Sequence, residues 1–196
     1  MNNHSAIIIF VRHPELGKVK TRLAATIGNE KALEVYNILL KHTFDVVQNI
    51  RVPVYVFYAD RLPLADIWKG DNILKRNQKG NNLGERMHNA FKEVFELGHS
   101  KAVIIGSDCY ELSSKILTES LEHLDETNLV IGPARDGGYY LLGMNAPLKN
   151  VFEIIEWSTP AVFSSTIKII RENKWTITEL PVLTDVDTES DITFNY

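Results

Sequence analysis

The segment that spans residues 12–22 gathers positive charge around a glycine. It contains four cations, Arg12, Lys18, Lys20 and Arg22. Gly17 would allow the backbone to approach a ligand closely, and the lysine and arginine side chains would then bind phosphate oxygens. A solvated loop would have the same composition. A Walker A loop is excluded, because valine follows Lys18 where serine or threonine is needed.

Carboxylates at two places in the second half of the chain could hold a divalent cation. Asp108 follows an apolar run that ends near Gly106, and a carboxylate at the end of a buried strand is well placed to bind a metal that neutralises a diphosphate. Asp185 and Asp187 are separated by one residue, so in an extended segment they point to the same side and could share a metal. Each group also has a structural interpretation: Asp108 could cap a turn or helix, and Asp187 or Thr188 could begin a short helix.

An acidic, glycine-rich turn lies between two apolar runs. Asp136, Gly137 and Gly138 permit a tight turn and leave room for a flat ligand or a sugar against the backbone. The same residues are typical of a hairpin between two strands, and the two interpretations are compatible. We expect a substrate-binding loop here.

Two other segments contain candidate ligand contacts. The polar loop at residues 77–85 could supply backbone or side-chain amides from Gln78 and Gly80. Trp157 precedes a predicted helix and is typical of packing, with substrate contact as the alternative. Cys109 has no indicated histidine or asparagine partner, so we expect a structural thiol rather than a nucleophile.

Short apolar runs alternate with amphipathic stretches along the chain. Strands are predicted at residues 6–11, 52–58, 102–106, 129–132, 139–143 and 176–180, and helices at 30–48, 83–96, 113–124 and 159–173. Residues 60–82 are predicted to be irregular, with a possible short strand at 73–74. This alternation indicates an α/β fold whose mainly parallel sheet has helices on both faces. Ligands of such sheets bind in the loops beyond the carboxyl ends of the strands, where the candidate residues lie.

The overall composition is that of an ordinary soluble globular protein. The 196 residues, at about 150 per domain, predict a single domain over residues 1–196. A net charge of −4 argues against nucleic acid as a partner and leaves a small molecule. One cysteine excludes internal disulfides and multi-cysteine metal sites. No apolar run approaches the ~20 residues of a membrane span, and the first five residues lack the features of a signal peptide, so we expect a cytoplasmic protein. The oligomeric state is left open.

The order of these motifs resembles one bacterial family. The blocks that carry the resemblance are FVRHPELGKVKTRL at residues 10–23, QKG at 78–80, LGERM at 83–87, GSDC at 106–109, GPARDGGYYLLG at 132–143, WST at 157–159 and DVDT at 185–188. Together they are similar to the radical-SAM/selenodomain-associated glycosyltransferase-like proteins, a former domain of unknown function in the nucleotide-diphospho-sugar transferase (GT-A) superfamily. The resemblance implies a three-layer Rossmann-like GT-A fold with a mixed, mostly parallel sheet. It also implies kinship with molybdenum-cofactor and 2-phospholactate nucleotidyltransferases.

The resemblance further implies roles for individual residues. Lys20 and Arg22 would face the phosphates of a nucleotide, Asp108 would bind Mg²⁺ or Mn²⁺, and Asp187 would be a second ligand. The sequence departs from the family pattern at Tyr110, where relatives usually have proline.

Two further departures lie near these residues. Arg12 replaces a common lysine, and Gly106 precedes Asp108 by two residues, so Asp108 is not part of an Asp-x-Asp pair.

We therefore predict a metal-dependent transferase with a nucleotide-activated donor, glycosyltransferase-like with a sugar nucleotide. The alternatives are a nucleotidyltransferase that releases pyrophosphate from a nucleoside triphosphate, and a non-catalytic nucleotide-binding module. A dehalogenase-type phosphatase is excluded, because too few residues follow the DVDT motif to complete that fold. The predicted catalytic residues are Lys20, Arg22 and Asp108; the nucleotide- and phosphate-binding residues Arg12, Gly17, Lys20, Arg22, Gln78 and Gly80; the substrate-binding residues Asp136, Gly137, Gly138 and Trp157; and the metal ligands Asp108 and Asp187.

Overall fold

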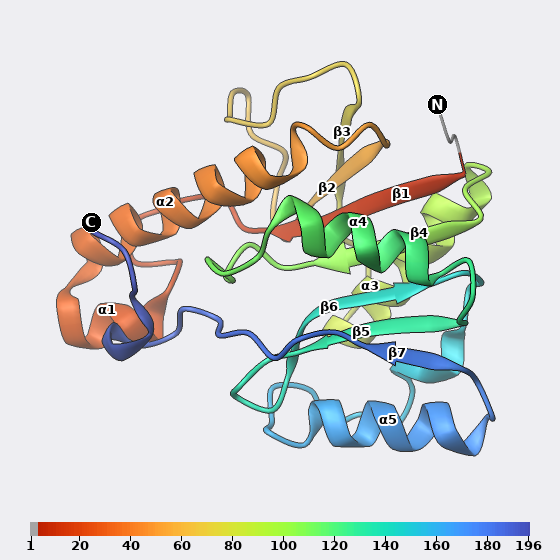
Figure 1. Ribbon diagram of the computed structural model, residues 1–196. Helices are drawn as coiled ribbons and strands as arrows, with labels where there is room; N and C mark the ends of the chain where they lie inside the picture. Colours follow the sequence, from red (N-terminus) through yellow and green to blue (C-terminus); the bar gives the residue numbers. More distant parts are fainter. Residues whose placement is uncertain (1–3) are drawn as a thin grey trace.

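The computed structural model describes residues 4–196, which form a three-layer α/β fold (Figure 1). Residues 1–3 lie outside the described part. The expectation about a signal peptide is based on residues 1–5, so most of that segment lies outside the described residues. Within residues 4–196 one seven-stranded sheet has the order β3-β2-β1-β4-β6-β5-β7. The strands are β1 (Ser5–Val11), β2 (Val54–Tyr58), β3 (Ile73–Asn77), β4 (Lys101–Ile105), β5 (Leu129–Pro133), β6 (Tyr139–Met144) and β7 (Ile177–Glu179). The sheet is mixed and mostly parallel, as predicted, because β6 alone among these described strands runs antiparallel to its neighbours.

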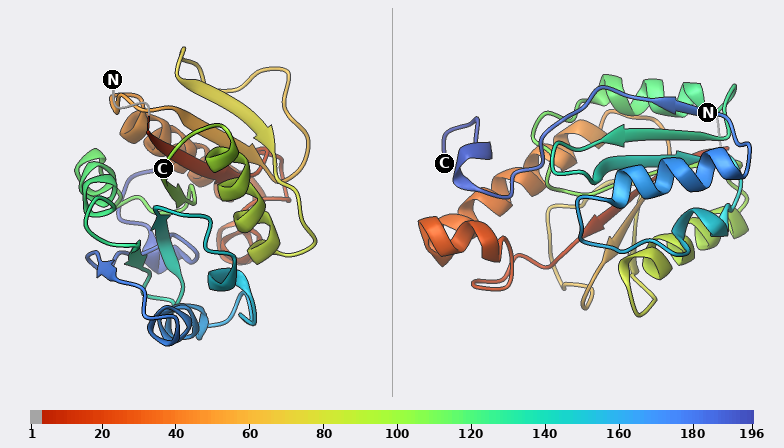
Figure 2. Two further views of the ribbon diagram at one scale, coloured as in Figure 1. Left: turned by 90° about the vertical axis from the view of Figure 1, so that its right-hand side faces the viewer. Right: turned by 90° about the horizontal axis from the view of Figure 1, so that it is seen from below.

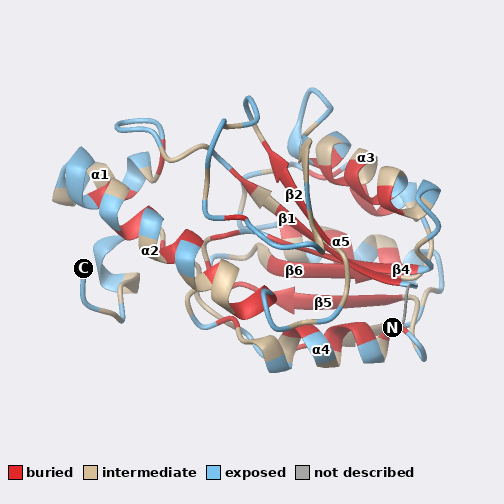
Figure 3. Ribbon diagram, turned by 90° about the horizontal axis from the view of Figure 1, so that it is seen from above, coloured by how far each residue is buried: buried red, intermediate tan, exposed pale blue. Residues whose placement is uncertain are grey.

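Helices cover both faces of the sheet (Figure 2). They are α1 (Thr21–Ile27), α2 (Asn29–Val47), α3 (Leu83–Glu96), α4 (Ser114–His123) and α5 (Val162–Glu172), with 3₁₀ turns η1 (Lys149–Phe152) and η2 (Glu189–Asp191). Helices α2 and α4 pack on one face, and α3, η1 and α5 pack on the other. Strand β1 contributes to both, since Ile7 and Ile9 face the first layer and Ile8 faces the second. Figure 3 shows the result: central strands are buried, while the helices expose their outer faces.

The strand order places two loops side by side. The chain passes from β1 to β2 and β3 on one side, and β4 then pairs with the other side of β1. Such a reversal opens a crevice at the carboxyl ends of the two central strands. The loop after Val11 and the loop after Ile105 therefore leave the same edge of the sheet. Strand β6 begins at this edge as well, because it is antiparallel and pairs Leu141 with Ile105.

The C-terminal segment returns to the same edge. After β7 it forms single bridges from Leu183 to Ala134 and from Asp185 to Cys109, and Val186 N donates to Asp108 O at 2.9 Å. Val186 also packs in a small cluster with residues of α1 and α2. In Figure 1 the C-terminus accordingly lies beside α1, beyond the carboxyl end of β1.

The structure corrects several predicted boundaries. Helix α1 was not expected, because it has only seven residues and buries only Leu23. Strand β3 extends to Asn77, beyond the predicted pair of residues. It is an edge strand whose side chains are half-buried or exposed, so its sequence lacks the apolar run that marked the other strands. Helix α5 begins at Val162 rather than at residue 159, because Pro160 follows a loop in which Ser158 has a φ of 65°. No helix within residues 4–196 combines the length and apolarity that a bilayer crossing needs.

Candidate active site

Two adjoining cavities open at the carboxyl edge of the sheet. One has a volume of about 620 Å³ and the other about 660 Å³. We call the first the basic cavity and the second the aromatic cavity, after the side chains described below. Asp108, Asp187 and Arg22 line both cavities and therefore lie at the boundary between them.

The basic cavity is lined by an excess of cations. They come from the loop after β1, from the start of α1 and from α3, and are Arg12, Lys18, Lys20, Arg22 and Arg86. Asp108 and Asp187 are the carboxylates on its wall, and Gln78 adds a side-chain amide. A cavity of this size and charge can hold the phosphates of a nucleotide, because guanidinium and ammonium groups form charge-assisted hydrogen bonds with phosphate oxygens.

Lys20 lies between the loop after β1 and the carboxylates of Asp108 and Asp187. It has left-handed backbone angles, with a φ of 47°, immediately before α1. Only 6% of its side chain is exposed, and its Nζ lies 3.1 Å from Asp108 Oδ2 and 3.4 Å from Asp187 Oδ1. Arg22 Nη1 lies 2.9 Å from Asp187 Oδ2 but is 73% exposed. Lys20 thus contacts both predicted metal ligands, and Arg22 contacts Asp187.

These carboxylates suit a divalent cation of the magnesium type. One ammonium group contacts both Asp108 and Asp187, so the two side chains are close enough to share a single cation. No cluster of three histidine, cysteine, aspartate or glutamate side chains arranged for a metal occurs between residues 4 and 196. Mg²⁺ commonly uses one or two protein carboxylates and takes its remaining ligands from water and substrate phosphates. The donor set therefore fits Mg²⁺ or Mn²⁺ bound together with a phosphate ligand.

Burial changes the protonation of two groups behind this pair. It raises the pKa of Asp185 to about 7, with a further contribution from the negative charge of Asp108, while Lys20 opposes the change. Burial also raises the pKa of the Cys109 thiol to about 12, and the thiol is free. A thiol that remains protonated at neutral pH is a poor nucleophile, in agreement with the structural role expected for Cys109.

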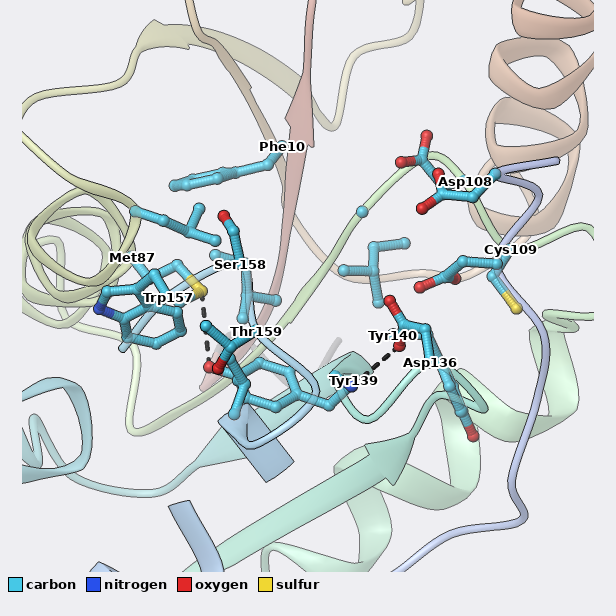
Figure 4. Close-up of a pocket in the computed structure, with 18 of the residues that line it drawn as sticks. Phe10, Met87, Asp108, Cys109, Asp136, Tyr139, Tyr140, Trp157, Ser158 and Thr159 are labelled. Carbon is cyan, nitrogen blue, oxygen red and sulfur yellow. Dashed lines mark hydrogen bonds between the residues drawn. The ribbon is translucent and has the colours of Figure 1, made fainter. Parts of the chain in front are cut away.

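The aromatic cavity has two unlike walls (Figure 4). Phe10, Met87, Tyr139 and Trp157 gather on one side, and carboxylates lie on the other. Trp157 packs closely over Gly84, where an added Cβ would come within 2.5 Å of the indole nitrogen. This contact explains why a residue without a side chain stands at the start of α3.

Asp136 contributes to the polar wall of the aromatic cavity. Its Oδ1 accepts a hydrogen bond from Gly138 N at 2.8 Å, which orders the turn between β5 and β6. Gly138 lines the cavity as well. Gly137 has a φ of 92° and does not line either cavity; an added Cβ would lie 2.2 Å from Pro160 O, so this glycine allows the turn to pack against the loop before α5.

The remaining predicted residues divide between the cavity wall and its support. Arg12 lines the basic cavity, and its backbone N and O bond to the hydroxyl of Tyr36. Gln78 also lines it, although its Nε2 donates to Phe57 O at 3.0 Å. Gly17 and Gly80 line neither cavity. Gly80 O accepts from Arg86 Nε at 3.1 Å and thereby orients a cation of the basic cavity.

Several residues of the site were not singled out in the sequence. Ser158 lines both cavities and has a φ of 65°, which no local sequence signal predicts for a serine. Phe10 and Met87 were assigned only to a strand and to the apolar face of a helix, and their places on the aromatic wall depend on how those elements pack. Arg86 could have been recognised as a second basic element, because it follows the polar loop at residues 77–85.

A family model described as "Uncharacterized protein conserved in bacteria (DUF2064)" matches residues 42–159. The matched segment runs from α2 to the loop before α5 and includes Asp108, Asp136 and Trp157. A search of the curated proteins found no match to the chain.

Solved structures share the fold over almost the whole chain. A protein from Desulfovibrio desulfuricans G20, provisionally named a nucleotide-diphospho-sugar transferase, is 33% identical with a TM-score of 0.86, over 95% of this chain and 83% of that one. CMP:2-keto-3-deoxy-manno-octonic acid synthetase complexed with CTP is 10% identical with a TM-score of 0.59, over 96% and 95% of the two chains. The manganese complex of Rv0371c from Mycobacterium tuberculosis H37Rv is 13% identical with a TM-score of 0.55, over 95% and 94%. The last two comparisons establish similarity of fold.

Proposed function

This chain belongs to the DUF2064 family of proteins conserved in bacteria, and on that premise we propose that it is a metal-dependent transferase that uses a nucleotide-activated donor. The donor that we favour is a sugar nucleotide, because the relative with 33% identity bears the name of a nucleotide-diphospho-sugar transferase. The acceptor is a small molecule, and the protein works in the bacterial cytoplasm. The resemblance to the radical-SAM/selenodomain-associated glycosyltransferase-like proteins supports the same choice of donor.

One observation carries the proposal: the shared boundary of two cavities with different chemistry. The basic cavity suits the phosphates of the donor, and the aromatic cavity suits a second, less charged molecule. Asp108 and Asp187 line both, so a donor and an acceptor bound in the two cavities would meet at these carboxylates. A transferase must place its two reactants in contact, because this replaces a bimolecular encounter by an oriented one.

Lys20 and Arg22 supply the positive charge for the departing phosphates. Negative charge grows on the leaving group as the bond to it breaks, and cations already held in place stabilise that charge without reorganisation. Each such group contributes about 10²–10³ in rate in comparable sites. A divalent cation held by Asp108 and Asp187 would add Lewis-acid stabilisation of the same phosphates. Asp136 lies across the aromatic cavity, where it can accept a hydrogen bond from the acceptor.

Nucleotidyl transfer is the second candidate. The abundance of cations in the basic cavity favours it, because a nucleoside triphosphate carries more negative charge than the diphosphate of a sugar nucleotide. The two reactions differ in the bond that breaks. Glycosyl transfer breaks the bond between the sugar carbon and the phosphate oxygen and releases a nucleoside diphosphate, whereas nucleotidyl transfer breaks a bond at the α-phosphorus and releases pyrophosphate. Chromatography of the products distinguishes them.

A thermal-shift panel tests the donor. Nucleoside triphosphates and sugar nucleotides are added to the protein with Mg²⁺, with Mn²⁺ and with EDTA. We expect a rise in Tm with at least one nucleotide, larger with metal than with EDTA, since a ligand of the native state stabilises it. Absence of stabilisation by every nucleotide would refute the proposal. Stabilisation without product from any acceptor would favour a non-catalytic nucleotide-binding module.

A further inference from the structure

The aromatic cavity has a charge pattern that selects against one class of acceptor. Four carboxylates line it, those of Asp108, Asp136, Asp185 and Asp187. Arg22 is the one lysine or arginine among the described residues on its wall, and Asp187 already pairs with it at 2.9 Å. A phosphorylated or carboxylated molecule placed in this cavity would therefore meet negative charge without a cation to receive it.

The cations of the neighbouring cavity do not change this balance. Lys20 reaches the boundary but is paired with Asp108 and Asp187. A donor bound in the basic cavity brings its own phosphates to those cations and to a divalent cation held by the two carboxylates. Asp136 and Asp185 have no lysine, arginine or histidine partner at ion-pair distance in the part of the chain that the structure describes. Asp136 therefore remains as a charged acceptor of hydrogen bonds on the polar wall of the aromatic cavity.

The opposite wall offers an apolar surface of fixed shape. Trp157 is held over Gly84, and the hydroxyl of Tyr139 lies 3.9 Å from Met87 Sδ. Phe10 completes this wall from the end of β1, as Figure 4 shows. Aromatic rings pack against the C–H face of a ring or chain that carries hydroxyl groups on its other side. A ligand between the two walls would present carbon to the rings and hydroxyl groups to the carboxylates.

We infer that the aromatic cavity binds an uncharged, hydroxyl-rich acceptor, such as a sugar or polyol, and excludes acceptors that carry phosphate or carboxylate groups. This inference rests on the proposed function, since it names the second substrate of the same site. Its basis is the juxtaposition of a carboxylate wall and an aromatic wall, with Asp136 as the residue that sets the discrimination. Carboxylates opposite an anionic competitor provide specificity by repulsion, while the uncharged ligand gains hydrogen bonds.

Binding to the nucleotide-saturated protein tests the acceptor class. The protein is saturated with Mn²⁺ and the nucleotide that stabilises it most, so that anions cannot enter the basic cavity. Calorimetry then measures the Kd of matched pairs: glucose and glucose 6-phosphate, glycerol and glycerol 3-phosphate, glucose and glucuronate. We expect the uncharged member of at least one pair to bind about tenfold or more tightly than its anionic partner. Equal or tighter binding of the anionic members, or no binding of any uncharged member, would overturn the inference.

Two variants and a control locate the discrimination. Asp136→Lys should reverse the preference in favour of the anionic members, and Asp136→Asn, which keeps an acceptor for Gly138 N, should reduce it. Asp71→Lys makes the same change of charge at an exposed turn before β3 and should leave the preference unchanged. Unaltered preference in both Asp136 variants would overturn the role of this residue. Nucleotide binding is measured in the same samples. If the native protein binds no nucleotide, the proposed function is refuted; if it binds a nucleotide but does not prefer the uncharged ligands, only the inference about the acceptor is refuted.

Discussion

The ammonium group of Lys20 lies 3.1 Å from Asp108 Oδ2, and this contact joins the first loop of the sheet to the loop after β4. The lysine side chain is almost completely buried, whereas Asp108 is 43% exposed. The pair therefore places a fixed positive charge under carboxylates that remain open to a ligand.

Lys20→Met should destabilise the protein and increase its response to metal. Asp108 and Asp187 would lose the cation that they share, at a cost of about 1–2 kcal/mol given their partial exposure. Mg²⁺ should then raise the Tm of the variant more than that of the native protein. Differential scanning calorimetry with and without Mg²⁺ measures both effects. Lys18→Met is the matched control, because Lys18 is 70% exposed and pairs only with Glu15 among the described residues; a response equal to that of Lys20→Met would contradict the prediction.

Asp108→Asn should abolish metal-dependent nucleotide binding and lower kcat by about 10²–10³-fold. The amide keeps the shape of the side chain but removes the charge that attracts a divalent cation. Titration of the nucleotide in Mn²⁺ and in EDTA gives the metal-dependent part of the affinity. Asp71→Asn, at the opposite end of β3, should behave as the native protein. If Asp108→Asn retained metal-dependent turnover, Asp108 would not be a ligand of the catalytic metal.

Asp185 should make the stability of the metal-free protein fall as the pH rises. Its pKa is raised from 3.8 to about 7 in the folded state, mainly by burial. Between these two pH values the folded protein holds a proton on Asp185 that the unfolded chain has lost. The free energy of unfolding therefore falls as the pH rises through this range, and the fall ends above about pH 7, where Asp185 is ionised in both states. Asp185→Asn removes this contribution.

Urea unfolding across this pH range in EDTA checks the effect of Asp185. The variant should gain about 1–3 kcal/mol of stability relative to the native protein between about pH 5 and about pH 8. A difference between the two proteins that does not change with pH would show that Asp185 titrates in the folded state as it does in the unfolded chain.

Gly132→Ala should destabilise the sheet beside the site. An added Cβ would lie 2.3 Å from Cζ of Tyr140, whose hydroxyl is fixed by a hydrogen bond to Pro181 O at 3.0 Å. The ring cannot move without breaking that bond, so we expect a loss of about 1–3 kcal/mol. Gly106→Ala serves as the control, since the nearest atom to its Cβ would be Asp108 N at 4.0 Å. Thermal unfolding of both variants should show a lower Tm for Gly132→Ala alone.

Local sequence patterns determined most of the fold. The apolar, β-branched run that becomes β1 is covered on both faces, and its alternation with amphipathic helices sufficed to predict a mostly parallel sheet. The Asp-Gly turn predicted the hairpin of β5 and β6, and the helix predicted to begin at residue 113 is α4, which Ser113 caps. These features follow from contacts between residues that are close in the sequence, or from the simple requirement that apolar side chains be buried.

The tertiary structure alone decided how the site residues meet. Lys20 and Asp187 are far apart in the sequence, and the return of the C-terminal segment along Cys109 and Asp108 brings them to 3.4 Å. No periodicity encodes that path, because it depends on strand order and on single bridges between irregular segments.

The same reason applies to the aromatic cavity. Phe10, Met87 and Trp157 come from a strand, a helix and a loop, and each has the sequence signature of an ordinary core residue. The sequence therefore determined which charges this protein carries and on which loops, while the packing of the sheet edge decided that cations gather in one cavity and carboxylates face aromatic rings in the other.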